Sequence, residues 1–216
     1  MKRFITLSIL LFVTLLALQA RPKGDLSQRH QVRVGWGDML FETMAFHPSV
    51  THDYVSPSAL PGDFSIQERH SYRYTGHLFA EYQFRATRVV RVGGLLDFEG
   101  IFWKESEFDS NHVQRGATVP IRNYNVVVMP TVRFDYLNRE WWSLYSGLGA
   151  GALFAFDNQG GNAYSPALNL NFLGVQVGKG HWSGGLELGL MAALSSGYKI
   201  YMLGSRLVSV SLNYRW

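Results

Sequence analysis

Two long alternating segments within residues 71–103, joined by a very short connection, constrain the fold more than any other feature. In the first segment one parity is largely apolar and carries Tyr72, Tyr74, Gly76, Leu78, Ala80, Tyr82 and Phe84. The other parity is largely polar and includes Arg73, His77, Glu81 and Arg85. Because successive side chains of a strand point to opposite faces, this period of two predicts a strand with one apolar and one polar face. The pattern restarts after Arg88, so the sequence predicts a β-hairpin.

The length of the arms indicates what the hairpin crosses. At roughly 3.3 Å per residue, the chain from Tyr72 to Phe84 covers about 40 Å. A strand tilt of about 40° reduces this height to about 30 Å, the thickness of the hydrocarbon core of a bilayer. A slip of one residue would turn Arg73 and Arg85 toward the apolar side, where an arginine near the bilayer midplane costs about 2–4 kcal/mol. We therefore interpret the segment as a hairpin of a transmembrane β-barrel.

The start of the chain has the pattern of an export signal. Lys2 and Arg3 precede an apolar run over residues 4–18, and Ala20 ends an imperfect small-residue cleavage site. This predicts a cleaved signal peptide over residues 1–20, followed by a short periplasmic leader over residues 21–29. The alternative is an uncleaved anchor, which the run is too short to favour, since a spanning helix needs about 20 residues.

Composition excludes several classes of protein. The chain has no cysteine, which excludes disulfides, a lipid-modified N-terminal cysteine and cysteine zinc sites. Its formal charge of +4 is too small to indicate a nucleic-acid partner. Lysine is scarce, although a water-facing barrel normally carries many lysines on its surface. Since no spanning helical run follows the signal, a closed barrel is the remaining way across a bilayer.

Eight strands are predicted within a single domain over residues 30–216, and an even number is typical of bacterial single-chain barrels. The expected ranges are 30–41, 72–84, 90–102, 122–136, 142–156, 166–178, a seventh around 186–190, and 208–216. Long loops at 47–69, 104–120 and 157–165, and a shorter one at 195–201, are expected outside the cell, with short turns in the periplasm. A change of parity predicts a bulge near Leu173 and Gly174. Pro130 is expected to mark an edge or a bulge.

Alternation alone does not say which face is outside, and a lipocalin-like soluble binder would turn the apolar face inward. Aromatic residues gather near strand ends on the apolar face, as interfacial girdles do. Glycines on the polar face make room for large side chains in a narrow interior. Both features favour an apolar exterior. The expected girdle is Tyr72, Tyr74, Tyr82, Phe84, Tyr136, Trp142, Phe156, Tyr214 and Trp216.

The polar face predicts a buried network rather than a catalytic site. Arginines and carboxylates on neighbouring strands are expected to pair across the interior, and a barrel of this size is normally filled by side chains. We expect no catalytic, cofactor-binding or metal-ligating residues, because the seven histidines lack ligand spacing. The glycine repeat over residues 147–151 lies within a strand, which favours interior packing over a phosphate-binding loop. The expected network is Arg73, His77, Glu81, Arg85, Arg91, Asp97, Glu99, Arg133, Asp135 and Glu187.

Several segments resemble a known family. Residues 124–156, together with YTGHLFAEYQFR and GVQVGKGHWSGGLELGL, are similar to small outer-membrane β-barrel proteins of Bacteroidetes type. The resemblance implies an eight-stranded architecture of the OmpA/OmpX type in the outer membrane of a Gram-negative bacterium. It also implies that the last strand is read by the outer-membrane assembly machinery, through Val210, Leu212, Tyr214 and Trp216. The resemblance implies no single activity.

The expected function is a structural or surface-interaction role, with membrane lipids as partners and with the outer loops carrying any recognition. A lipid-modifying barrel enzyme, such as a lipid A deacylase or acyltransferase, is a second hypothesis. Its available residues are Ser195, Ser196 and His181, which the expected topology separates to opposite ends. A narrow channel is a third hypothesis.

Overall fold

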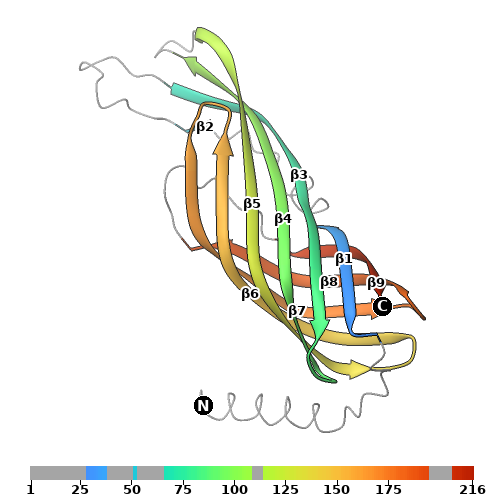
Figure 1. Cartoon of the computed structure of the whole chain (residues 1–216). Helices are drawn as coiled ribbons and strands as arrows, with labels where there is room; N and C mark the ends of the chain where they lie inside the picture. The colour runs from blue at the N-terminus through green and yellow to red at the C-terminus, as the bar shows by residue number, and fades with distance from the viewer. Residues whose placement is uncertain (1–27, 38–50, 53–65, 109–113, 195–205) are drawn as a thin grey trace, which may run out of the picture.

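The computed structural model describes residues 28–37, 51–52, 66–108, 114–194 and 206–216, which form one antiparallel sheet. Figure 1 shows long strands, each running in the direction opposite to its neighbours. Their bounds are β1 His30–Gly37, β2 Thr51–His52, β3 Ile66–Arg85, β4 Val90–Phe108, β5 Gln114–Asn138, β6 Trp142–Asp157, β7 Asn162–Val177, β8 Trp182–Ala193 and β9 Val208–Arg215. No helix among these residues is long and apolar enough to cross a membrane.

The sheet closes into a ring because β1 pairs with two partners. Along one side β1 pairs with β3, with Val34 opposite Ala80, and along the other it pairs with β9, with Val34 opposite Leu212. The remaining strands pair in chain order, and the two-residue β2 adds only to the far part of β3. The prediction of eight antiparallel up-and-down strands is therefore confirmed.

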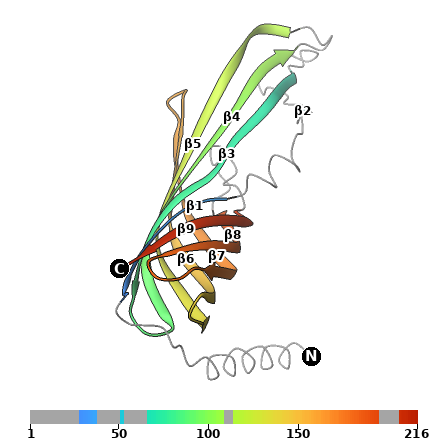
Figure 2. The ribbon, with the colours of Figure 1, turned by 90° about the vertical axis from the view of Figure 1, so that its right-hand side faces the viewer.

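Three neighbouring strands, β3, β4 and β5, rise well beyond the others as a tall extension, which Figure 2 shows from the side. This corrects the predicted loop over 104–120, because β4 continues to Phe108 and β5 begins at Gln114. It also corrects the predicted loop over 47–69, which contains β2 and the first residues of β3. Backbone pairing sustains these segments although their side chains lack an apolar parity. The hydroxyls of Ser106 and Thr118, for example, lie 2.9 Å apart across the ladder.

The predicted loop over 157–165 is also shorter than expected. Strand β6 runs to Asp157 and β7 begins at Asn162, which leaves a four-residue turn, 158–161. The Asp157 carboxylate accepts hydrogen bonds from the amides of Gln159 (2.9 Å) and Gly161 (2.6 Å) and so stabilises the turn. Polar residues and paired glycines are typical of long loops and of tight turns alike, so the composition of this segment did not distinguish the two. The expected loop at 195–201 lies outside the described residues.

The register shifts at several places in the sheet, and the sequence predicted one of them. The register shifts between Asn171 and Leu173, which confirms the predicted bulge. Pro130 lies inside β5 with no register shift beside it: it and both its neighbours pair with β4, whereas the ladder to β6 omits Met129 and Pro130. It lies opposite Gly94, where a Cβ would meet open space, so the prediction of an edge or bulge at Pro130 is wrong.

Candidate functional site: a layered polar interior

Polar and apolar side chains are distributed over the ring in the reverse of the usual order for a soluble protein. Large apolar side chains cover the outward face and are exposed, for example Val34 (58%), Leu96 (52%) and Leu212 (57%). Charged side chains of the alternate positions are buried inside, including Arg33, Glu81, Arg91, Asp97, Glu99, Arg133, Asp135 and Glu187. The interior is therefore the one polar environment in which these strands place ionisable groups together.

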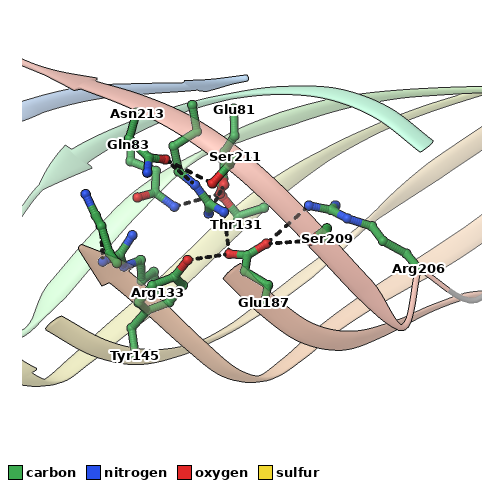
Figure 3. Close-up of polar contacts among 12 residues, drawn as sticks. Glu81, Gln83, Thr131, Arg133, Tyr145, Glu187, Arg206, Ser209, Ser211 and Asn213 are labelled. Atoms are coloured by element: carbon green, nitrogen blue, oxygen red, sulfur yellow. Dashed lines mark hydrogen bonds and ion pairs between the residues drawn. The ribbon is translucent and has the colours of Figure 1, made fainter. Parts of the chain in front are cut away.

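Arg33 on β1 is the centre of the middle layer of this interior, and its partners Glu81, Glu187 and Asn213 are labelled in Figure 3. Its Nη1 donates to Glu81 Oε2 at 2.7 Å, and its Nη2 forms an ion pair with Glu187 Oε1. Its Nε donates to Asn213 Oδ1 at 3.1 Å. One guanidinium thus links β1 to β3, β8 and β9, and both carboxylates that it binds are buried.

Neutral donors complete the coordination of the two carboxylates. Thr131 Oγ1 and Gln83 Nε2 donate to Glu81 Oε1 at 2.7 and 2.8 Å. Tyr145 donates its hydroxyl to Glu187 Oε1 at 2.8 Å. Figure 3 shows these groups converging from opposite sides of the ring. A cavity of about 20 Å³ lies beside them, which is room for about one water molecule, so side chains fill this layer.

The Tyr145 ring extends this layer toward the end that carries the short turns. The guanidinium of Arg133 stacks on the ring, with Cζ 3.4 Å from its centroid. Gly174 lies directly opposite Tyr145 in the ladder, and a Cβ at Gly174 would overlap the ring. The glycine is therefore required by the close approach of an aromatic side chain, and not by its backbone angles.

A second polar cluster lies at the mouth of the ring beside the short turns. Asp135 binds two arginines there, accepting from Arg91 Nε at 2.8 Å and from Arg133 Nε at 2.6 Å. Arg133 Nη2 also donates to Gln176 Oε1 at 2.7 Å, and Gln176 Nε2 donates to Ser183 Oγ at 2.6 Å. We call this end the short-turn mouth, because the turns β3–β4, β5–β6 and β7–β8 border it.

An apolar layer interrupts the polar interior beyond the Arg33 cluster. Its members are buried side chains from β3 to β8, namely Phe79, Leu95, Val127, Met129, Leu153, Ala167 and Met191. Phe79 also lies under the guanidinium of Arg206, whose Cζ is 3.9 Å from the ring centroid. The layer separates the Arg33 cluster from polar groups nearer to the tall extension.

Those further groups surround His77 on β3. Its Nδ1 lies 2.7 Å from Asp97 Oδ1, and its Nε2 lies 3.8 Å from Glu99 Oε1. Arg206 approaches the second oxygen of Asp97 with its Nη1 at 3.6 Å and Glu187 Oε2 with its Nη2 at 3.4 Å. Arg206 thereby connects the two polar layers on either side of the apolar one. Within the described part of the chain, no group of three or more His, Asp or Glu residues is arranged to hold a metal ion.

The structure buries nine of the ten expected network residues inside the ring: eight lie in the clusters described above, and Arg85 lies opposite Arg91 at the short-turn mouth. The side chain of Arg73 lies outside the described set. Its backbone pairs with Phe102, and register shifts on either side of it break the parity that the sequence shows. Gly76, with a φ of +69°, accompanies the second shift. The regular alternation therefore does not continue unbroken through residues 72–76.

Sequence reasoning missed several members of the network: Arg33, Gln83, Thr131, Tyr145, Arg206 and Asn213. Arg33 and Asn213 do lie on the polar parity of their strands, so the same alternation could have identified them. Tyr145 could not be found in this way, because an aromatic residue on an interior position looks like a break in the pattern.

The aromatic residues form two bands on the outward face. At the short-turn end, His30 stacks on Trp216, Tyr214 stacks on Trp216, and Trp182 packs against Tyr214. Toward the other end, Tyr124 packs against Phe98 and Phe102. Of the expected girdle, Tyr82, Phe84, Tyr136, Trp142, Phe156, Tyr214 and Trp216 lie on the outward face. The side chains of Tyr72 and Tyr74 are outside the described set.

His181, the one described member of the set considered for an enzymatic role, contacts the end of β9. Its Nδ1 lies 2.7 Å from the carbonyl oxygen of Arg215, and its ring stacks on Tyr214. Ser195 and Ser196 lie outside the described residues.

Comparison with solved structures gives only weak similarity. No protein-family model matches the chain, and no curated protein matches it. Among solved structures, LpxR from Salmonella typhimurium is similar, with 9% sequence identity and a TM-score of 0.26. The alignment covers 87% of this chain and 99% of that chain. The resemblance to Bacteroidetes-type barrels stays a prediction.

Proposed function

We propose that this chain is an outer-membrane β-barrel protein with a structural or surface-interaction role, exported through a cleaved signal peptide. The observation that carries the proposal is the apolar, exposed outward face around a buried network of ion pairs. In water, a contiguous apolar belt of this extent would favour aggregation. Against lipid tails, it is the surface that a barrel requires. A lipocalin-like binder needs the opposite arrangement, with the apolar side chains inside.

The height of the apolar belt supports a bilayer as its surroundings. Tyr124 and Tyr136 lie on the outward face of β5, twelve residues apart, in the two aromatic bands. At about 3.3 Å per residue and a tilt of about 40°, this separation corresponds to about 30 Å of height. That height matches the hydrocarbon core of a bilayer, about 30 Å.

The placement of charge on the outward face supports the same proposal. Among the strand residues whose side chains the structure describes, Lys104 and Arg122 are the two charged ones on that face. Both lie two residues beyond the aromatic band, next to Phe102 and Tyr124. They border a hollow of about 560 Å³ whose lining also includes Pro120. Cations at this level would reach anionic headgroups, whereas cations within the belt would not.

The tall extension of β3, β4 and β5 gives the proposed recognition role a location. Short turns belong on the periplasmic side in barrels of this class, which puts the extension outside the cell. The outward side chains of the last strand, Val210, Leu212, Tyr214 and Trp216, are proposed to be read by the assembly machinery.

The test is folding into lipid. The mature chain, unfolded in urea, is diluted into phosphatidylcholine vesicles and examined by electrophoresis with and without boiling, and by protease digestion. We expect the unboiled protein to migrate differently from the boiled protein, and residues 78–98 to resist protease only when vesicles are present. A protein that is folded, monomeric and soluble without lipid or detergent would refute the proposal.

A further inference from the structure

Three arginines stand side by side at the short-turn mouth. Arg85, Arg91 and Arg133 belong to β3, β4 and β5, and the ladder places Arg91 directly opposite each of the other two. All three side chains are buried. Like charges directly opposite one another on neighbouring strands destabilise a sheet. The row therefore needs compensation from a negative group.

The described residues supply only part of that compensation. Asp135 is the carboxylate that binds the row, through Arg91 and Arg133. A fourth arginine, Arg215 on β9, has an intermediate exposure at the same mouth. Glu81 is already bound to Arg33, and Glu140 is exposed and bound to Lys179. The three guanidinium groups of Arg91, Arg133 and Arg215 therefore face one carboxylate, and the described side chains leave an excess of positive charge among them.

Unused hydrogen-bond donors mark the same place. Arg91 Nη1, Arg133 Nη1 and Arg215 Nε are buried and make no hydrogen bond among the residues described. Gln31 Nε2, opposite Arg215 in the ladder, is a further buried donor that makes no hydrogen bond among the described residues. Buried donors without partners are unfavourable, and several at one location indicate a missing acceptor.

We propose that Arg91, Arg133 and Arg215 at the short-turn mouth bind a phosphate-class oxyanion. Guanidinium groups bind phosphate through paired, charge-assisted hydrogen bonds, and their planar forks suit its tetrahedral oxygens. Phosphate carries about −1.5 to −2 charges near neutral pH, which would offset most of the excess. Access is from the mouth, where Arg215 is partly exposed. This inference requires a closed ring and does not depend on what surrounds its outer wall.

The experiment measures binding of inorganic phosphate to the full mature chain folded in detergent, by calorimetry and by thermal unfolding. Chloride at equal ionic strength controls for screening. We expect phosphate to raise the Tm and chloride not to do so. Glycerol 3-phosphate is a soluble stand-in for a lipid headgroup. If it binds better than inorganic phosphate, the phosphate is supplied by a headgroup, and if it does not, by the free ion.

Two variants separate binding from a merely structural role. Arg91→Gln and Arg215→Gln each remove a positive charge from the mouth, and each is expected to weaken phosphate binding about tenfold. In phosphate-free buffer, Arg215→Gln is expected to raise the Tm, because repulsion among the arginines is relieved. Arg88→Gln, which changes an exposed residue on the adjoining β3–β4 turn, is the charge-matched control and should retain binding.

Any of three results would overturn the site. One is a Tm that responds equally to phosphate and chloride. A second is phosphate binding that survives both variants unchanged. The third is a loss of stability in Arg215→Gln that is the same with and without phosphate, which would assign the arginine to packing alone.

Discussion

Arg33 and Glu187 form an ion pair across the interior of the ring, although 154 residues separate them in the chain. Arg33 also binds Asn213 on β9, the strand that meets β1 where the ring closes. The guanidinium therefore joins the first and last strands from inside the ring, in addition to the backbone ladder that pairs them. Its full set of partners exists only once the ring has closed.

Removal of Arg33 should be severely destabilising. In Arg33→Met, both Glu81 and Glu187 remain buried without their cation, and breaking a buried pair in this way costs about 3–5 kcal/mol. The measurement is the free energy of unfolding in urea, with the protein folded in vesicles. Lys179→Met, which removes an exposed partner of Glu140, is the control and should change stability little. A mild effect at Arg33 would mean that water replaces the guanidinium.

A charge placed on the outer wall should be costly only if that wall faces lipid. Leu148 lies on the outward face of β6 between Val132 and Leu170 and is 48% exposed. Leu148→Arg is expected to lower the stability of the vesicle-folded protein by about 2–4 kcal/mol. Gln159→Arg, at an exposed position of the β6–β7 turn, is the control. If Leu148→Arg instead improves solubility without lipid and leaves stability unchanged, the wall faces water.

The contact between Tyr145 and Gly174 predicts a specific intolerance. Gly174→Ala would push a methyl group into the Tyr145 ring and is expected to cost about 1–3 kcal/mol, as overpacking of a core does. Gly184→Ala is matched to it, because a Cβ at Gly184 meets its nearest neighbour, the Val177 carbonyl oxygen, at 4.0 Å. Urea unfolding of the two variants should differ clearly. Equal effects would show that the ring moves aside at no cost.

The apolar layer inside the ring predicts that ions do not pass. We expect no steady conductance from the wild-type protein in a planar bilayer. Met129→Ala combined with Leu153→Ala shortens two members of the layer and should give conducting openings, at a cost in stability of about 2–5 kcal/mol for each site. Leu96→Ala on the outer wall is the control. Regular conductance steps from the wild type would show that the layer opens.

The turns allow a direct test of orientation, since the chain has no native cysteine. Single cysteines at Asn158 and at Arg88 lie in turns at opposite ends of the ring. With an impermeant reagent on intact cells, we expect Asn158→Cys to be labelled and Arg88→Cys to be protected. A third cysteine at Asp109, outside the described residues, is expected to behave like Asn158→Cys. Labelling of Arg88→Cys alone would reverse the orientation.

The regular part of this fold could be predicted from the sequence because one physical rule governs it. Where a strand separates two different environments, its side chains alternate, and the eight strands and the bulge near Leu173 follow from this alternation. The rule fails where both faces are polar. For this reason the extension around Ser106 and Thr118 resembled a loop, although backbone pairing holds it in the sheet.

The sequence could predict that the interior is polar and buried, but not which residues pair with one another. The positions of Glu81, Asp135 and Glu187 on the polar parity indicated burial, but their partners depend on register between strands far apart in the chain. Arg206 lies before the start of β9, outside any alternating segment, so the sequence gives no signal for it. Its φ is 46°. Its contact with Asp97 and Glu187 required three-dimensional information.

The pairing of the first and last strands has a consequence for biogenesis. Until residues 208–215 are available, β1 and β8 each have an unpaired backbone edge, and such edges recruit other chains. A molecule truncated before this segment would therefore have two unpaired strand edges instead of a closed sheet. Once exported, such a fragment should remain soluble only while chaperones bind it. After dissociating from them, it should aggregate or be degraded by proteases.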